Sequence, residues 1–105
     1  MEPVVIRDDE YYKNLKTVKR LEKQIDEDKQ QLKETKAYLI KSKERMVDFE
    51  KRIKATVEED ELEYLNDGKA ELEQDIEDAF NYIEELELNI EDYKEKLEKL
   101  LKKIK

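Results

Sequence analysis

Half of the 105 residues are charged, and 30 acidic against 22 basic side chains give a formal net charge of −8. The chain contains one Gly, one Pro, no Cys, no His and no Trp. An average globular domain is only about 25% charged, whereas many Glu, Lys and Leu residues with almost no Gly or Pro are typical of long helices. The composition therefore excludes sheet-based folds and predicts a single all-α domain.

The missing residue types also limit the chemistry. Without Cys and His, the chain has no thiolate or imidazole to bind a metal ion or to act as nucleophile or base. The single Gly lies in Asn66-Asp67-Gly68, so there is no Gly-rich phosphate loop, and the apolar residues just before it do not fit a calcium-binding EF-hand loop. We therefore expect no enzymatic activity, catalytic residue, cofactor, metal site or small-molecule substrate.

Residues 1–7 are predicted to form a flexible arm ahead of one helical domain, 8–105. The apolar stretch from Pro3 to Ile6 either packs back on the first helix or adds as a strand to the sheet edge of another protein. The arm is too short and lacks the basic start of a secretory signal, and no run of about 18 apolar residues predicts a membrane span. The expected location is the cytoplasm, or the host cytoplasm if the gene is viral.

A first helix is predicted over about residues 8–55. From Tyr11 to Ile53 an apolar residue recurs at every seventh position, which we define as heptad position a. The matching d column is poorer, because five of its seven residues are polar: Asn14, Asp28, Thr35, Ser42 and Thr56. Polar residues in a seam fix register at a cost in stability. We expect the small Thr35 and Ser42 to receive larger side chains, such as Phe80, from the opposite helix.

The chain reversal is predicted within residues 55–68. The first apolar series ends and the second begins nine residues apart, where an unbroken heptad needs seven. Thr56 followed by Glu59 fits a capping box that begins the second helix, whereas Asn66-Asp67-Gly68 is the stronger turn signal by composition. We favour the earlier site. The alternative is one continuous helix of about 95 residues, roughly 140 Å long at 1.5 Å per residue.

The second helix is predicted to run from the reversal to residue 105. Its seam residues from Leu62 to Ile104 follow at alternating steps of three and four over six heptads, with Lys69 as the one polar member. Two such helices predict a long antiparallel coiled-coil hairpin. The residues predicted to form its seam and to support self-association are Val18, Leu21, Ile25, Leu32, Leu39, Met46, Phe49, Ile53, Leu72, Ile76, Ala79, Ile83, Leu86, Ile90 and Leu97.

Apolar residues outside the seam predict a second contact. On the second helix these are Phe80, Tyr82, Leu88 and Leu101, and on the first helix they are Leu15, Tyr38, Ile40 and Val47. Because apolar surface on more than one helix face requires more than one packing partner, we expect two hairpins to associate as a homodimeric four-helix bundle. The open alternative is that an unrelated partner covers this surface.

The charges are segregated along the chain. Residues 1–57 hold 15 basic and 12 acidic side chains, residues 58–92 hold one basic and 16 acidic, and residues 93–105 hold six basic and two acidic. An antiparallel fold places the acidic segment along a basic part of the first helix, whereas a parallel homodimer would align like charges. The side chains expected to face one another are Lys29, Lys36, Lys43, Arg45 and Arg52 on the first helix and Glu61, Glu73, Asp75 and Glu87 on the second.

Carboxylates on the outer face of the second helix form a candidate partner site. Several of them lack the Lys or Arg four residues later that usually neutralises a helical Glu. We call the following residues the acidic ridge: Glu71, Glu77, Asp78, Glu84, Glu85, Glu91 and Asp92. The ridge is either a solvated face or a surface for a basic protein, including a mimic of a nucleic-acid backbone. Repulsion disfavours direct binding of nucleic acid.

A basic cluster follows the ridge at the C-terminal end of the second helix, from Lys94 to Lys105. Favourable interaction with the helix dipole and pairs such as Glu98 with Lys102 account for most of it. The alternative functions are an electrostatic contact with an acidic protein surface and a weak contact with nucleic acid.

The sequence thus predicts a non-enzymatic coiled-coil protein that acts through protein–protein interaction, in assembly, scaffolding or as an adaptor, and that associates with itself. The alternative is an acidic inhibitor, such as a phage could encode, whose carboxylate ridge mimics nucleic acid and occupies a basic nucleic-acid-binding partner.

Overall fold

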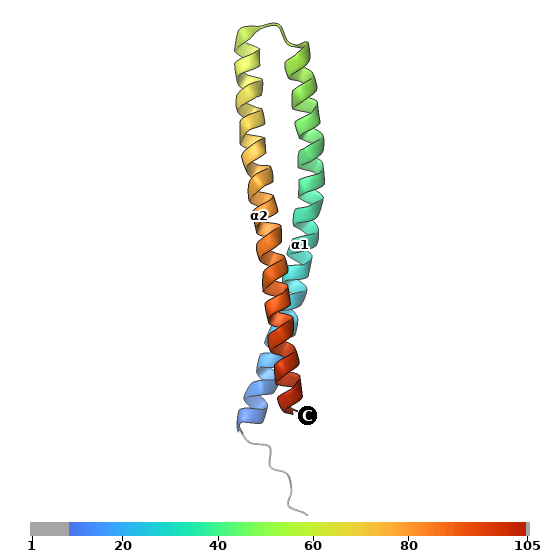
Figure 1. Cartoon of the computed structure of the whole chain (residues 1–105), viewed down its shortest axis with the longest axis vertical. Coiled ribbons are helices and arrows are strands. Elements are labelled where there is room, and N and C mark those ends of the chain that lie inside the picture. The colour runs from blue at the N-terminus through green and yellow to red at the C-terminus, as the bar shows by residue number, and fades with distance from the viewer. Residues whose placement is uncertain (1–8, 105) are drawn as a thin grey trace, which may run out of the picture.

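The computed structural model describes residues 9–104, which form two long helices, α1 (Asp9–Ala55) and α2 (Glu59–Ile104). The helices run side by side in opposite directions and are joined by residues 56–58 (Figure 1). At 1.5 Å per residue, the 47 residues of α1 span about 70 Å. The predicted all-α hairpin is confirmed, and the alternative of one continuous helix is wrong. The predicted arm, 1–7, lies outside the described residues, as do residues 8 and 105.

The connection is short because hydrogen bonds cap the helices on both sides of it. Thr56 Oγ1 donates to the carbonyl oxygen of Arg52 at 2.7 Å, and the Thr56 amide lies 3.4 Å from the carbonyl oxygen of Ile53. The amide of Leu62 donates to the carbonyl oxygen of Glu58 at 3.0 Å, which makes Glu58 the N-cap of α2. The predicted capping box is therefore wrong, because Thr56 completes the end of α1 instead of beginning α2.

Gly68 lies inside α2 and not in a turn. Its φ is not positive, and the ring of Phe49 from α1 packs against it: a Cβ at this position would lie 3.0 Å from Phe49 Cε1 and 3.1 Å from Phe49 Cζ. The close approach of an aromatic ring explains a Gly in a helix interior, where it costs about 1 kcal/mol relative to Ala. The Asn66-Asp67-Gly68 turn signal is thus wrong, and the reversal lies at the earlier end of the predicted range.

The helices meet along both heptad series. Every member, from Tyr11 to Thr56 and from Leu62 to Ile104, is buried or half-buried. The fully buried apolar residues are Val18, Leu21, Ile25, Leu39, Leu65, Leu72, Ala79, Leu86 and Ile90. The other residues predicted for the seam are half-buried: Leu32, Met46, Phe49, Ile53, Ile76, Ile83 and Leu97. Two helices therefore cover only one face of each other.

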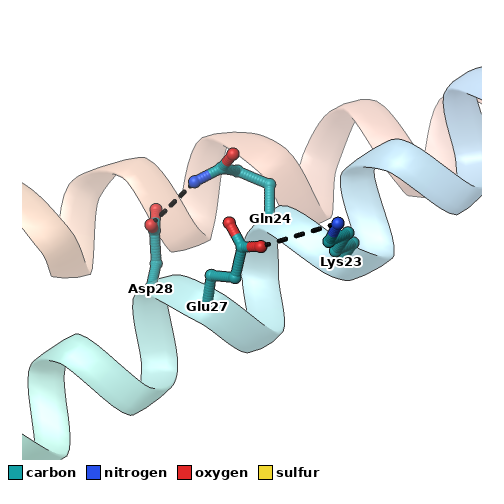
Figure 2. Close-up of polar contacts among 4 residues, drawn as sticks. All are labelled: Lys23, Gln24, Glu27 and Asp28. Carbon is teal, nitrogen blue, oxygen red and sulfur yellow. Dashed lines mark hydrogen bonds and ion pairs between the residues drawn. The ribbon is translucent and has the colours of Figure 1, made fainter.

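Two polar residues of α1 are fully buried within this seam. Asp28 is buried, and its Oδ1 accepts a hydrogen bond from Gln24 Nε2 at 2.9 Å (Figure 2). Ser42 is only 1% exposed. Phe80 does not enter the seam beside Thr35 or Ser42, since its side chain is 47% exposed. That expectation is wrong because Phe80 follows the d position Ala79 and therefore lies at position e, beside the seam.

Candidate interaction surfaces

The two flanks of the seam differ in how their charges are paired. We name them by heptad position, because e faces e and g faces g across an antiparallel pair. On the e flank, Lys36 Nζ lies 3.8 Å from Glu87 Oε1, and Lys43 Nζ lies 5.2 Å from the centre of the Phe80 ring. Lys69, in the seam, reaches Glu50 on this flank at 3.8 Å. These contacts join α1 to α2 along the e flank.

The charge pairing predicted between the helices is realised only in part. Lys36 and Glu87 do meet. In contrast, Arg52 pairs with Asp48 of its own helix at 3.4 Å, and Glu73 pairs with Lys69 of its own helix at 3.9 Å. Ion pairs four residues apart in one helix compete with pairs across the seam, because they form in any register between the two helices. Exposed pairs of either kind add only about 0.2–1 kcal/mol to the free energy of unfolding. The exposed pair of Lys23 and Glu27 at 4.0 Å is another example (Figure 2).

The g flank has no ion pair between α1 and α2 within residues 9–104, and it carries two grooves that are each lined by charges of one sign. The first, which we call the basic groove, has a volume of about 500 Å³ near the free ends of the helices. Its floor includes Leu21 and Leu100, and four basic side chains and no acidic one line it: Arg20, Lys96, Lys99 and Lys103. Lys96 Nζ is bonded to Asp92 at 3.0 Å. The groove therefore presents an excess of positive charge.

The second groove of the g flank, the acidic groove, lies nearer the connection and has a volume of about 410 Å³. Tyr38 from α1 and Tyr82 from α2 both line it. Three carboxylates and no basic residue also line it: Glu34, Asp75 and Asp78. Asp78 Oδ1 accepts a hydrogen bond from Gln74 Nε2 at 2.9 Å, which leaves its charge unneutralised. One flank of the hairpin thus carries a basic and an acidic groove in succession.

The acidic ridge lies on the solvent-facing side of α2, and all seven of its residues are exposed. Asp92 is bonded to Lys96, and Asp78 to Gln74. The other five form no ion pair with any residue in the described range: Glu71, Glu77, Glu84, Glu85 and Glu91. No ion pair within the described range joins a ridge residue to α1.

The ridge consists of two columns that face different ways. Glu71, Asp78, Glu85 and Asp92 occupy heptad position c, next to g, and Asp78 lines the acidic groove. Glu77, Glu84 and Glu91 occupy position b, farther from the g flank. The sequence predicted the ridge but not the contribution of Arg20 and Glu34 to the grooves. Their contribution follows only from the antiparallel alignment of the two helices, which brings the c and g positions of both to the same flank.

Comparison with known proteins adds no assignment, because no family model, no curated protein and no solved structure matches the chain. Within residues 9–104, no group of carboxylates has the arrangement of a metal site. The same residues include no helix that is both long and apolar enough to cross a membrane. The candidate sites of the described residues are therefore the two charged grooves of the g flank and the acidic ridge.

Proposed function

We propose that this chain is a non-enzymatic coiled-coil protein that acts through contacts with other proteins, and that it pairs with a second copy in a four-helix bundle. The observation that carries the proposal is the thin seam. Among residues 9–104, nine apolar side chains are buried along about 70 Å. Large apolar side chains remain exposed on several helix faces: Tyr12, Tyr38, Ile40, Val47, Tyr64, Phe80, Tyr82, Leu88 and Leu101.

Helix pairs gain most of their stability from packing of their apolar faces and little from helix propensity alone. A hairpin that packs on one face therefore gains further stability when a second hairpin covers another face, as in four-helix bundles. A stiff rod with charged grooves suits a role in assembly, scaffolding or adaptation. A cytoplasmic location is part of the proposal, since a chain without Cys makes no use of the disulfides that stabilise many small secreted domains.

Light scattering coupled to gel filtration tests self-association directly. We expect a mass of two chains at concentrations well above micromolar, with a concentration-dependent unfolding midpoint because dimerisation stabilises the folded state by mass action. A mass of one chain throughout this range, with a midpoint independent of concentration, would contradict the proposal.

The ridge supports a second candidate function, in which the chain is an inhibitor of a basic, nucleic-acid-binding protein. Five exposed ridge carboxylates have no ion pair within residues 9–104, so their field extends into solvent. A synthetic arginine-rich peptide serves as the probe. We expect it to bind wild type with an affinity that falls as salt rises, and to bind a variant with Glu77, Glu84 and Glu91 changed to Lys at least tenfold more weakly. Equal binding by the two proteins would exclude this function for the ridge.

A further inference from the structure

The basic and acidic grooves of the g flank are separated along the same helix. Lys99 lines the basic groove and Asp78 lines the acidic groove, and 21 residues of α2 separate them, or about 31 Å along a helix. The midpoint between them falls between Leu88 and Asn89, and of these two Asn89 occupies position g and is half-buried. The flank therefore has opposite charges at nearly equal distances on either side of a neutral polar residue.

We propose that the g flank is the surface through which two copies of this chain pair, in antiparallel orientation, about a two-fold axis near Asn89. This inference rests on the self-association proposed above and specifies its surface and register. A two-fold rotation about this point places the basic groove of each copy over the acidic groove of the other. The same contact then forms twice, as in any isologous interface, and opposite charges meet at both places.

The contacts across the axis are chemically matched. In this register Lys99 faces Asp78 of the second copy, and Lys103 faces Asp75. Lys96 approaches the Tyr82 ring, which suits a cation–π contact, and the two Asn89 amides meet, each with donors and an acceptor.

One contact across the axis is unfavourable. Asp92 approaches Glu85 of the second copy, and the two carboxylates repel each other. The Lys96 ammonium, 3.0 Å from Asp92 in the same chain, offsets this repulsion.

The alternative surfaces are less suited to this pairing. On the e flank, Lys36 and Glu87 are already paired with each other within one hairpin. On the g flank, no ion pair between the described parts of α1 and α2 competes. Exposed apolar surface does not distinguish the flanks, since Tyr38 and Tyr82 on the g flank are 43% and 41% exposed and Phe80 and Leu101 on the e flank are 47% and 41% exposed. The unpaired charges favour the g flank.

The register also determines the length of the dimer. The axis at Asn89 lies 30 residues from the start of α2 at Glu59 but only 15 from its end at Ile104. The two hairpins are therefore staggered, and their helical parts together span about 90 Å instead of the 70 Å of one hairpin. The connection of each copy extends beyond the free ends of the other.

Disulfide cross-linking tests the position of the axis, because the chain has no Cys of its own. Two Cys residues at position 89 would face each other across the axis, within the short Cβ separation that a disulfide needs. We expect Asn89→Cys to form a covalent dimer under mild oxidation at least tenfold faster than Leu88→Cys. Leu88 is the matched control, since it is adjacent in sequence but lies on the outer face of α2 and is 61% exposed. Equal rates, or faster cross-linking at position 88, would overturn the proposed axis.

Charge reversal tests the pairing of the grooves. Lys99→Glu and Asp78→Lys should each raise the dimer dissociation constant by roughly tenfold, since each change acts twice in a two-fold dimer. The double variant should return it close to the wild-type value, because the pair is restored with its charges exchanged. Glu77→Lys is the control, as it lies next to Asp78 in sequence but at position b, and it should change the constant by less than about twofold.

The outcomes separate this inference from the function on which it rests. A wild-type protein that stays monomeric refutes self-association and, with it, the surface. A wild-type dimer in which the double variant is not rescued refutes the g-flank register alone. Small-angle X-ray scattering supplies an independent check, because a helical length near 70 Å in the dimer would contradict the stagger.

Discussion

The contact of Phe49 with Gly68 gives the sharpest test of the packing between the two helices. Gly68→Ala should gain about 1 kcal/mol of helix propensity, because Gly68 lies in the interior of α2. The new Cβ, however, would lie 3.0 Å from Phe49 Cε1, which is closer than the optimal separation of about 3.5–4.0 Å between carbon atoms. The ring must then move by a few tenths of an ångström, and a side chain forced off its rotamer costs about 0.5–1.5 kcal/mol. The two terms nearly cancel, so we expect Gly68→Ala to change the unfolding free energy by less than about 0.5 kcal/mol.

The same substitution should behave differently when the ring is absent. In a Phe49→Leu background the shorter side chain leaves room for the Cβ, and Gly68→Ala should stabilise the protein by about 1 kcal/mol. The double-mutant cycle should therefore show a coupling of about 1 kcal/mol between the two positions. Asn81→Ala is a control, because Asn81 is exposed and more than three turns away in α2. It should give the same small gain in both backgrounds.

Urea denaturation followed by far-ultraviolet circular dichroism measures these free energies. All variants are compared at one protein concentration, because self-association would otherwise shift the midpoints. If Gly68→Ala stabilises both backgrounds equally, with a coupling below about 0.3 kcal/mol, the ring does not pack on Gly68. The glycine would then have no packing reason to lie inside α2.

Three further substitutions test other parts of the fold by the same assay. Ile83→Asp places a carboxylate in the seam and should cost more than about 2 kcal/mol, whereas Leu88→Asp on the outer face should cost less than about 0.5 kcal/mol; equal costs would contradict the seam. Thr56→Val removes the hydroxyl that donates to Arg52 and should cost about 1 kcal/mol, and no change would show that this bond does not support the end of α1. Ser42→Leu overfills a site that is 1% exposed and should cost about 1–3 kcal/mol, so a stabilised variant would mean that the helices are not in close contact there.

The sequence predicts the hairpin well because the seam repeats many times. A single heptad is weak information, but two series over six or seven heptads determine which face of each helix is covered. The phase change between the series then indicates that the helix is interrupted. The segregated charges favour antiparallel over parallel pairing, and the structure agrees.

Single residues were harder to predict, because their local and long-range roles conflict. Thr56 and Glu59 satisfy the local pattern of a capping box, yet the Thr56 hydroxyl bonds backward to α1. Gly68 follows two turn-forming residues, yet it lies inside a helix, where the Phe49 ring of the other helix packs against it. The role of such a residue depends on its contacts with the other helix. The register of that helix cannot be derived from the few residues on either side.

The grooves do not follow from the sequence for a related reason. Within α2 alone, the carboxylates form a ridge and the lysines near its C-terminal end form a separate cluster. In antiparallel register, Arg20 of α1 joins the lysines and Glu34 joins the carboxylates. Charge patterns of a hairpin should therefore be compared by flank and not by segment.

The division of the ridge into two columns makes the two proposed interactions compatible. Asp78 and the other position c carboxylates lie beside the g flank, where the proposed second copy binds. Glu77, Glu84 and Glu91 at position b lie outside that contact and form no ion pair within residues 9–104. A dimer would thus still expose one column of carboxylates on each copy, and the two columns would be related by the two-fold axis. If both proposals are right, Lys99→Glu should weaken self-association without abolishing binding of the arginine-rich peptide, and the change of the three position b residues to Lys should do the reverse.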